Sequence, residues 1–228
     1  MDSTTRTIYI LGAIVLLLFA GVLLLHSPAR TTIVEANTTV PEAILAQEVP
    51  EVPQEEEPAP PSTVAPERVV IETSKGIIEV ELDRENAPIT VENFVTYVNE
   101  GFYNGTIFHR VINGFMIQGG GFTSEGLPKE THSPIILESN NGLKNTRGTI
   151  AMARTMDSNS ATSQFFINVE DNSLLDYGPG NPGYAVFGKV TSGMDVVDQI
   201  KEVETTSKYG ASDWPTQDVL ILRVYLKE

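Results

Sequence analysis

The first hydrophobic segment is an uninterrupted run over residues 8–25, and it contains no charged side chain. A helix of this length would be about 27 Å long, close to the roughly 30 Å hydrocarbon thickness of a membrane. A cleaved signal peptide is the alternative, since Ser27-Pro28-Ala29 offers a small-x-small site, but its apolar core is usually only about 7–15 residues. The pattern favours a membrane anchor over residues 1–26.

Residues 27–67 show no apolar periodicity. They contain eight prolines and eight glutamates, including the run Glu55-Glu56-Glu57. Such a composition buries too little apolar surface to offset chain entropy, and proline and like charges extend the chain. We expect a disordered acidic linker that acts as a tether.

From Arg68 to Glu228 the hydrophobic positions predict one domain of short strands and two helices. One helix begins at Pro88 and ends before Gly101, and the other covers Met194–Val203. Alternating and apolar runs predict short strands. A domain with many short strands and few helices typically forms a barrel or a sandwich. The predicted strands are 69–73, 77–82, 106–112, 115–118, 149–153, 165–169, 185–190 and 219–226.

The composition excludes several kinds of function. The formal net charge is −15, and without a basic patch it argues against binding to nucleic acid or to an anionic membrane surface. The chain has no cysteine, which excludes disulfides, thiolate metal sites and cysteine nucleophiles. We expect no cofactor and no metal.

Other candidate motifs are weak. The three histidines have no metal-ligand spacing, and we interpret His109 as structural. Gly119-Gly120-Gly121 lacks the Lys, Ser or Thr of a phosphate loop, so it predicts a tight bend. The single tryptophan, Trp214, is expected to pack against a loop.

Three blocks of sequence resemble the cyclophilin signature. Residues 108–120 read FHRVINGFMIQGG, residues 148–153 read GTIAMA with SQFFIN at 163–168, and residues 184–190 read YAVFGKV. The resemblance covers nearly all of residues 68–228 and is closest to the bacterial periplasmic branch. It implies a mainly β fold, an eight-stranded antiparallel β-barrel capped by two α-helices, with peptidyl-prolyl cis-trans isomerase activity.

The reaction needs a hydrogen-bond donor more than an acid or a base. Rotation about an X–Pro bond crosses a barrier of about 18–20 kcal/mol, which is the loss of amide resonance. A donor aimed at the prolyl nitrogen stabilises the twisted amide. By resemblance Arg110 is this catalytic donor, and Gln118 positions it and binds the substrate backbone.

The resemblance also assigns the substrate contacts. A proline pocket is formed by Phe115, Met116, Phe166 and Leu175. The substrate backbone is expected at Ala153, Arg154 and Gln164, of which Arg154 often corresponds to Asn in the family.

Two positions depart from much of the family. Tyr184 stands where many cyclophilins carry a histidine in the pocket. Leu174 stands where the cytosolic eukaryotic branch has a tryptophan that contacts cyclosporin through its ring and its N–H.

Together these features predict a membrane-anchored isomerase that acts on proline-containing polypeptide clients. We expect a monomer, single-pass in the inner (cytoplasmic) membrane, with the catalytic domain facing the periplasm or exterior. Two alternatives remain open, a module that captures proline segments with incidental turnover and a structural anchor for a membrane complex. Arg110 and Gln118 favour the enzyme over a pure binder.

Overall fold

The computed structural model describes residues 67–228. The predicted membrane anchor and nearly all of the predicted linker lie outside these residues. Within residues 67–228, none of the helices has both the length and the apolar character that a membrane span requires.

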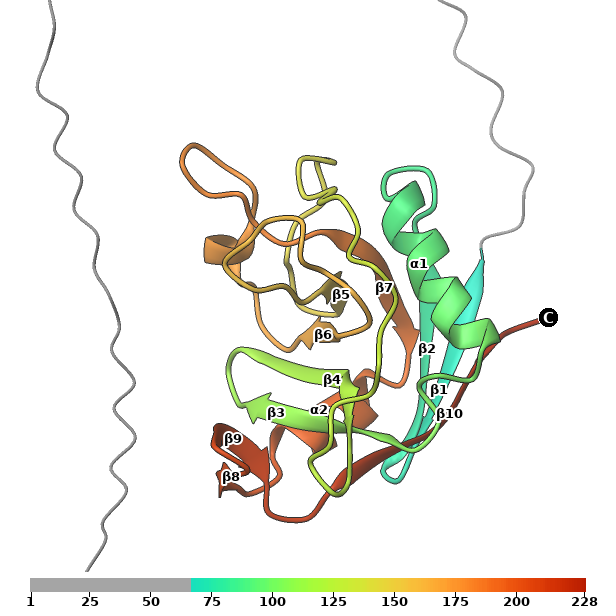
Figure 1. Cartoon of the computed structure of the whole chain (residues 1–228), viewed down its shortest axis with the longest axis vertical. Helices are drawn as coiled ribbons and strands as arrows, with labels where there is room; N and C mark the ends of the chain where they lie inside the picture. The colour runs from blue at the N-terminus through green and yellow to red at the C-terminus, as the bar shows by residue number, and fades with distance from the viewer. Residues whose placement is uncertain (1–66) are drawn as a thin grey trace, which may run out of the picture. The chain divides into compact units, whose positions relative to one another are not determined.

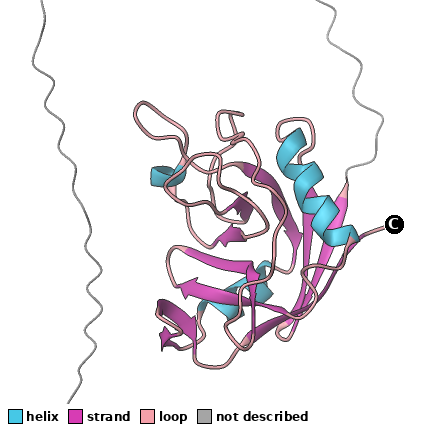
Figure 2. Ribbon diagram, in the orientation of Figure 1, coloured by secondary structure: helices cyan, strands magenta, loops and turns pink. Residues whose placement is uncertain are grey.

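Eight antiparallel strands form a closed barrel, in the order β1-β10-β3-β4-β6-β5-β7-β2 (Figures 1 and 2). Two helices, α1 (Pro88–Asn99) and α2 (Met194–Lys201), accompany it, as the sequence predicted. The barrel strands are β1 (Arg68–Thr73), β2 (Gly76–Leu82), β3 (Thr106–Ile112), β4 (Met116–Thr123), β5 (Thr149–Met152), β6 (Phe165–Asn168), β7 (Val186–Ser192) and β10 (Val219–Leu226).

Local sequence explains where α1 begins and ends. Pro88 occupies the first turn, where its missing N–H is not needed. The Glu138 carboxylate accepts hydrogen bonds from the next two backbone N–H groups, those of Ile89 and Thr90, at 3.1 and 2.7 Å. Gly101 follows the helix with a φ of 64°, the left-handed conformation that commonly ends a helix.

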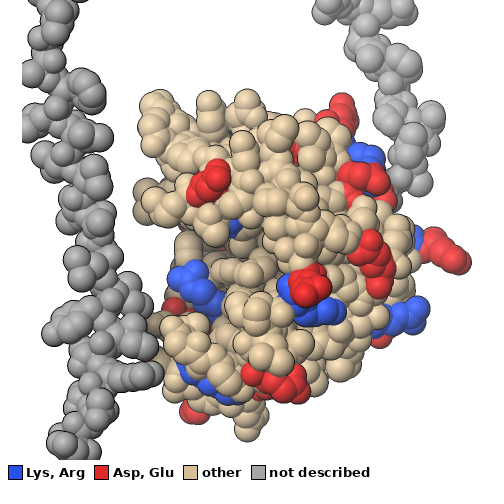
Figure 3. Space-filling view, in the orientation of Figure 1, with Lys and Arg blue, Asp and Glu red and all other residues tan. Residues whose placement is uncertain are grey.

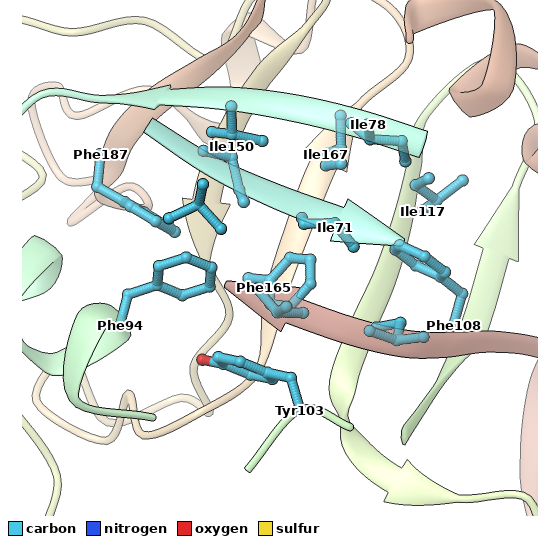
Figure 4. Packing of buried hydrophobic residues seen from close by; sticks show 14 of the residues in the cluster. Ile71, Ile78, Phe94, Tyr103, Phe108, Ile117, Ile150, Phe165, Ile167 and Phe187 are labelled. Carbon is cyan, nitrogen blue, oxygen red and sulfur yellow. The ribbon is translucent and has the colours of Figure 1, made fainter. Parts of the chain in front are cut away.

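The barrel interior is filled by aromatic and branched side chains (Figure 4). Phe165 lies at its centre, edge-on to Phe94, Tyr103 and Phe108 with ring centroids 5.5–6.1 Å apart. Tyr103 is fully buried, and its hydroxyl donates a hydrogen bond to the Ser163 carbonyl. Burial raises the pKa of this hydroxyl well above its usual value, so it stays neutral.

The prediction of a tight bend at Gly119-Gly120-Gly121 is wrong, because all three glycines lie inside β4. They make room for neighbours instead of turning the chain. A Cβ atom on Gly120 would lie 2.8–3.0 Å from the rings of Tyr103 and Phe165.

One hairpin was not predicted. β8 (Thr205–Lys208) and β9 (Ala211–Pro215) form a separate two-stranded sheet, and β9 lies against β3 (Figure 1). The polar sequence of β8 gives no hydrophobic alternation. Trp214 was expected to pack against a loop; it lies in β9 and packs instead on His109 of β3 and Phe122 of β4, and it is 1% exposed.

Candidate active site

A β-bulge in β3 turns Arg110 to the outside of the barrel. Phe108 pairs with Gly119 of β4, yet Arg110 pairs with the very next residue, Gln118, so His109 is an extra residue in the ladder. Residues two apart on a regular strand share a face, but here Phe108 points into the core and Arg110 points outward.

Arg110 heads a row of paired residues that crosses five neighbouring strands. It pairs with Gln118, which pairs with Phe166, which pairs with Ala151, which pairs with Val186. Directly paired residues on adjacent strands project from the same face. This row therefore brings a cation, an amide and an apolar surface together on the outside of the barrel.

The apolar part of the row belongs to a second hydrophobic cluster, separate from the barrel core, which we term the outer cluster. Its buried members are Met116, Ala151, Phe166 and Val186, and its partly buried members are Ile112, Phe115, Leu143, Ala153, Leu175 and Tyr184. All four residues predicted to form the proline pocket are in this cluster. On this side the molecule is hollowed, with basic side chains at the edge of the hollow (Figure 3).

Gln118 and Gln164 are joined side chain to side chain. The Gln118 Nε2 group donates to Gln164 Oε1 at 2.9 Å. Gly121 makes this approach possible, since a Cβ atom there would lie 2.5 Å from Gln164 Cγ. Between these residues and Arg110, no side-chain hydrogen bond is found in the described part of the chain. The nearest carboxylate to Arg110 is Asp213, with 3.7 Å between Nε and Oδ2.

The Arg154 guanidinium donates hydrogen bonds to backbone carbonyls of the protein itself. Nε and Nη2 donate to the Gly183 carbonyl at 3.0 and 2.8 Å, and Nη1 donates to the Thr155 carbonyl at 2.8 Å. The guanidinium also lies 4.5 Å from the ring centroid of Tyr184, a cation–π contact. Tyr184 in turn meets Phe166 edge-on at 5.7 Å. Arg154 thus supports a wall of the outer cluster.

Leu174 and Leu175 differ sharply in exposure. They lie in a short 3-10 helix, Ser173–Leu175. Leu175 packs against the outer cluster, whereas Leu174 is 89% exposed and stands at the surface.

Hydrogen bonds from three asparagines hold the backbone segments that carry Leu175 and Phe115, and the sequence alone did not indicate them. Asn145 Nδ2 donates to the Leu175 carbonyl at 3.0 Å, and Asn172 Nδ2 donates to the Phe115 carbonyl at 2.7 Å. Asn168 links the two, donating to Asn145 at 3.3 Å and accepting from Asn172 at 2.7 Å. Two of these asparagines are deeply buried, a signal that only the fold reveals.

His109, the bulge residue, is buried between Phe122 and Trp214, with ring centroids 4.7 and 5.8 Å away. Burial lowers its pKa to about 4, and the adjacent charge of Arg110 acts in the same direction. The imidazole is therefore neutral at physiological pH, in agreement with a structural role.

A different cavity, of about 600 Å³, lies on the far side of the outer cluster. Leu143 and Val186 contribute to both, but the cavity is otherwise lined by the end of β2, the 144–149 loop and β7. It contains neither Arg110 nor Gln118. No group of metal-ligating side chains occurs in residues 67–228.

Residues 68–226 match the family model described as cyclophilin type peptidyl-prolyl cis-trans isomerase/CLD. The chain is 56% identical over 153 residues to peptidyl-prolyl cis-trans isomerase A of Dickeya dadantii, covering 67% of this chain and 80% of the relative. It is 53% identical over 163 residues to isomerase B of Escherichia coli, covering 70% of this chain and 99% of the relative.

A solved structure is also similar. A cyclophilin-type isomerase of Cryptosporidium parvum has a TM-score of 0.61 and 27% identity to this chain. The match covers 72% of this chain and 99% of the solved one.

Proposed function

This chain belongs to the cyclophilin-type peptidyl-prolyl cis-trans isomerases, and we propose that Arg110 and the outer cluster together carry its activity. The observation that supports this assignment is the row across the barrel wall. It sets Arg110 two strands from Phe166, and neighbouring strands are about 4.8 Å apart. A prolyl ring on the outer cluster would thus lie within reach of the guanidinium.

In this mechanism the outer cluster holds the proline ring and Arg110 stabilises the twisted amide. As the C–N bond rotates, the prolyl nitrogen regains its lone pair, and a guanidinium N–H donates to it. An arginine guanidinium is suited to this task because it presents a rigid, planar fork of N–H donors. Gln118 and Gln164 are hydrogen-bonded to each other, and their amide groups bind the substrate backbone next to the row of paired residues.

We propose further that the enzyme is anchored to the inner membrane and assists folding beyond it. The uncharged run of residues 8–25 supports an anchor, and the acidic, proline-rich segment after it suits a tether that reaches many clients. Fractionation tests this. We expect the protein in the membrane pellet with its N-terminus at or near Met1, whereas a soluble chain starting near Arg30 would refute the anchor.

The catalytic proposal is tested on residues 68–228. A fragment of this extent is expected to fold, because it matches 99% of the Escherichia coli relative. Arg110→Ala should lower kcat/KM for a short X–Pro peptide by about 10²-fold, the usual cost of removing one preorganised donor. Its thermal unfolding should be unchanged, since the side chain is 42% exposed.

Arg223→Ala is the matched control, because it removes an exposed arginine from the adjacent strand β10 without touching the site. It should retain full activity. If Arg110→Ala also retained near-native activity while folded, the alternative of a proline-binding module with incidental turnover would be favoured.

A further inference from the structure

The Gln118 side chain does not hydrogen-bond Arg110, so another group must orient the Arg110 guanidinium. Gln118 pairs with Arg110 across the strands, but its amide hydrogen bond goes to Gln164. Within residues 67–228, the polar contact made by the Arg110 side chain is to the Asp213 carboxylate. At 3.7 Å this contact is longer than a hydrogen bond, and it is made to Nε.

Asp213 occupies an unusual backbone conformation. Its φ is 60°, and in the described part of the chain Tyr209 is the only other non-glycine residue with positive φ. Both belong to the β8–β9 hairpin region. Aspartate is among the few residues with a Cβ atom that adopt left-handed backbone readily.

The residue that follows Asp213 packs against the residue that precedes Arg110. Trp214, next to Asp213, packs on His109 and Phe122 with centroids 5.8 Å from each. His109 is the bulge residue that turns Arg110 outward. The hairpin therefore contacts both the bulge and the guanidinium.

We propose that Asp213 is a positioning residue for the isomerisation reaction. Its carboxylate attracts the Nε side of the Arg110 guanidinium, which leaves the two terminal nitrogens free to face the prolyl nitrogen. Because both side chains are about 40% exposed, the pair adds little to stability. Its effect is on geometry, to which catalytic donation is sensitive. This inference rests on the proposed role of Arg110.

The first test compares Asp213→Asn and Asp213→Gly with wild type in residues 68–228. Asparagine tolerates left-handed backbone and glycine adopts it without strain, so neither variant should lower thermal stability. Both should lower kcat by about three- to tenfold with KM little changed, since a donor is misaligned rather than removed. A merely structural residue would instead lower stability and activity together.

A matched control removes a comparable ion pair near the same hairpin. Asp218 lies 3.5 Å from Lys208, and in the described residues the ion pair of Arg110 is with Asp213, not with Asp218. Asp218→Asn should leave kcat and KM as in wild type. Loss of activity in this control equal to that of Asp213→Asn would overturn a specific role for Asp213.

A double-mutant cycle separates this inference from the function on which it rests. In an Arg110→Ala background, Asp213→Asn should have no further effect, because the group that it orients is gone. Additive losses would overturn positioning through Arg110. If Arg110→Ala is inactive but Asp213→Asn is fully active, the inference alone fails; if Arg110→Ala is active, the proposed mechanism fails first.

Discussion

Phe165 and Phe166 are adjacent in β6, and each belongs to a different face of the same barrel wall. Phe165 points inward and packs among Phe94, Tyr103 and Phe108. Phe166 points outward into the outer cluster, against Tyr184. The inner face is a closed core with no access for a ligand. The outer face is apolar too, but it borders a hollow and is flanked by Arg110 and Gln118 (Figure 3).

The inner and outer faces of this wall differ in what their apolar side chains contribute to the protein. Inside, burial of side chains stabilises the fold, and a rearrangement would be unfavourable because the packing is dense. Outside, the central members of the outer cluster are also buried, but partly buried side chains such as Phe115, Leu175 and Tyr184 border them and remain accessible to a ligand. In this strand Phe165 and Ile167 thus belong to the barrel core, whereas Phe166 belongs to the outer cluster.

The largest expected effect comes from exchanging the two phenylalanines for alanine, one at a time. Phe165→Ala should lower the free energy of unfolding by about 3–5 kcal/mol, because it leaves a cavity among aromatic rings. Phe166→Ala should also lower stability, because the ring is only 4% exposed, but it should lower kcat/KM more in the folded protein. Chemical denaturation and peptide isomerisation assays measure the two quantities.

Equal stability losses in the two variants, with equal activity per folded molecule, would contradict the division of the wall into two faces. Ile167→Val serves as a control for the inner face, since it removes one methyl group from the same strand. It should reduce stability slightly and leave kcat/KM unchanged.

His109 lies at the boundary between the two faces and should make stability depend on pH. Its pKa is lowered to about 4, so the unfolded chain binds more protons than the folded one between pH 6.5 and 4. Stability from this residue is complete above about pH 6.5 and is lost as pH falls, by roughly 3 kcal/mol at pH 4.

His109→Phe should abolish this component, because a phenyl ring fits among Phe122 and Trp214 and does not titrate. Those two neighbours carry no ionisable group. Urea unfolding at pH 7 and pH 4 gives the comparison. If wild type and variant lost the same free energy between these pH values, the imidazole would not be the titrating group.

Substitution of Arg154 tests the outer cluster without changing a residue of the barrel core. Arg154→Ala removes the support of Tyr184 and Gly183, so we expect KM for a prolyl peptide to rise about threefold to tenfold, with kcat little changed. Arg154→Lys keeps the charge but lacks the fork that bonds Gly183 twice, and it should give an intermediate KM. A change in kcat with KM unaltered would show that Arg154 acts on the chemistry instead.

Most of the barrel could be predicted from sequence, because inward positions such as Ile71, Ile78 and Ile150 follow regular alternation. The hairpin of β8 and β9 could not, since its strands are short and polar. The glycines of β4 were misinterpreted because a glycine run also suits a turn. Only the packed structure shows that these positions lie against aromatic rings and Gln164.

The site was predicted less completely than the barrel, and the bulge is the reason. Phe108 and Arg110 have the same parity, so alternation alone would place both in the core or both outside. The resemblance identified Arg110 and the pocket residues. The outer cluster contains the four pocket residues, and the cross-strand row links Arg110 to one of them, Phe166. Neither parity nor resemblance indicated Asp213, whose relation to Arg110 depends on a hairpin about 100 residues later.

The smallest expected effect concerns Leu174, an exposed residue next to Leu175 of the outer cluster. Leu174→Trp should not change stability, because a side chain that is 89% exposed has little packing to lose. By resemblance to the cytosolic eukaryotic branch, the indole would add apolar contact and one N–H donor for cyclosporin. One hydrogen bond contributes about 0.5–1.5 kcal/mol, so inhibition should tighten about threefold to tenfold.

Turnover of a prolyl peptide should hardly change in Leu174→Trp, since the proline ring is expected deeper, against Phe115 and Phe166. Inhibition titration of wild type and variant, beside their kcat/KM, measures both effects. Wild-type inhibition already at nanomolar drug, or no gain in the variant, would mean that the drug is held by other contacts. A matching rise in kcat/KM would mean that position 174 touches the substrate as well. The distinction between the exposed position 174 and the proline pocket would then fail.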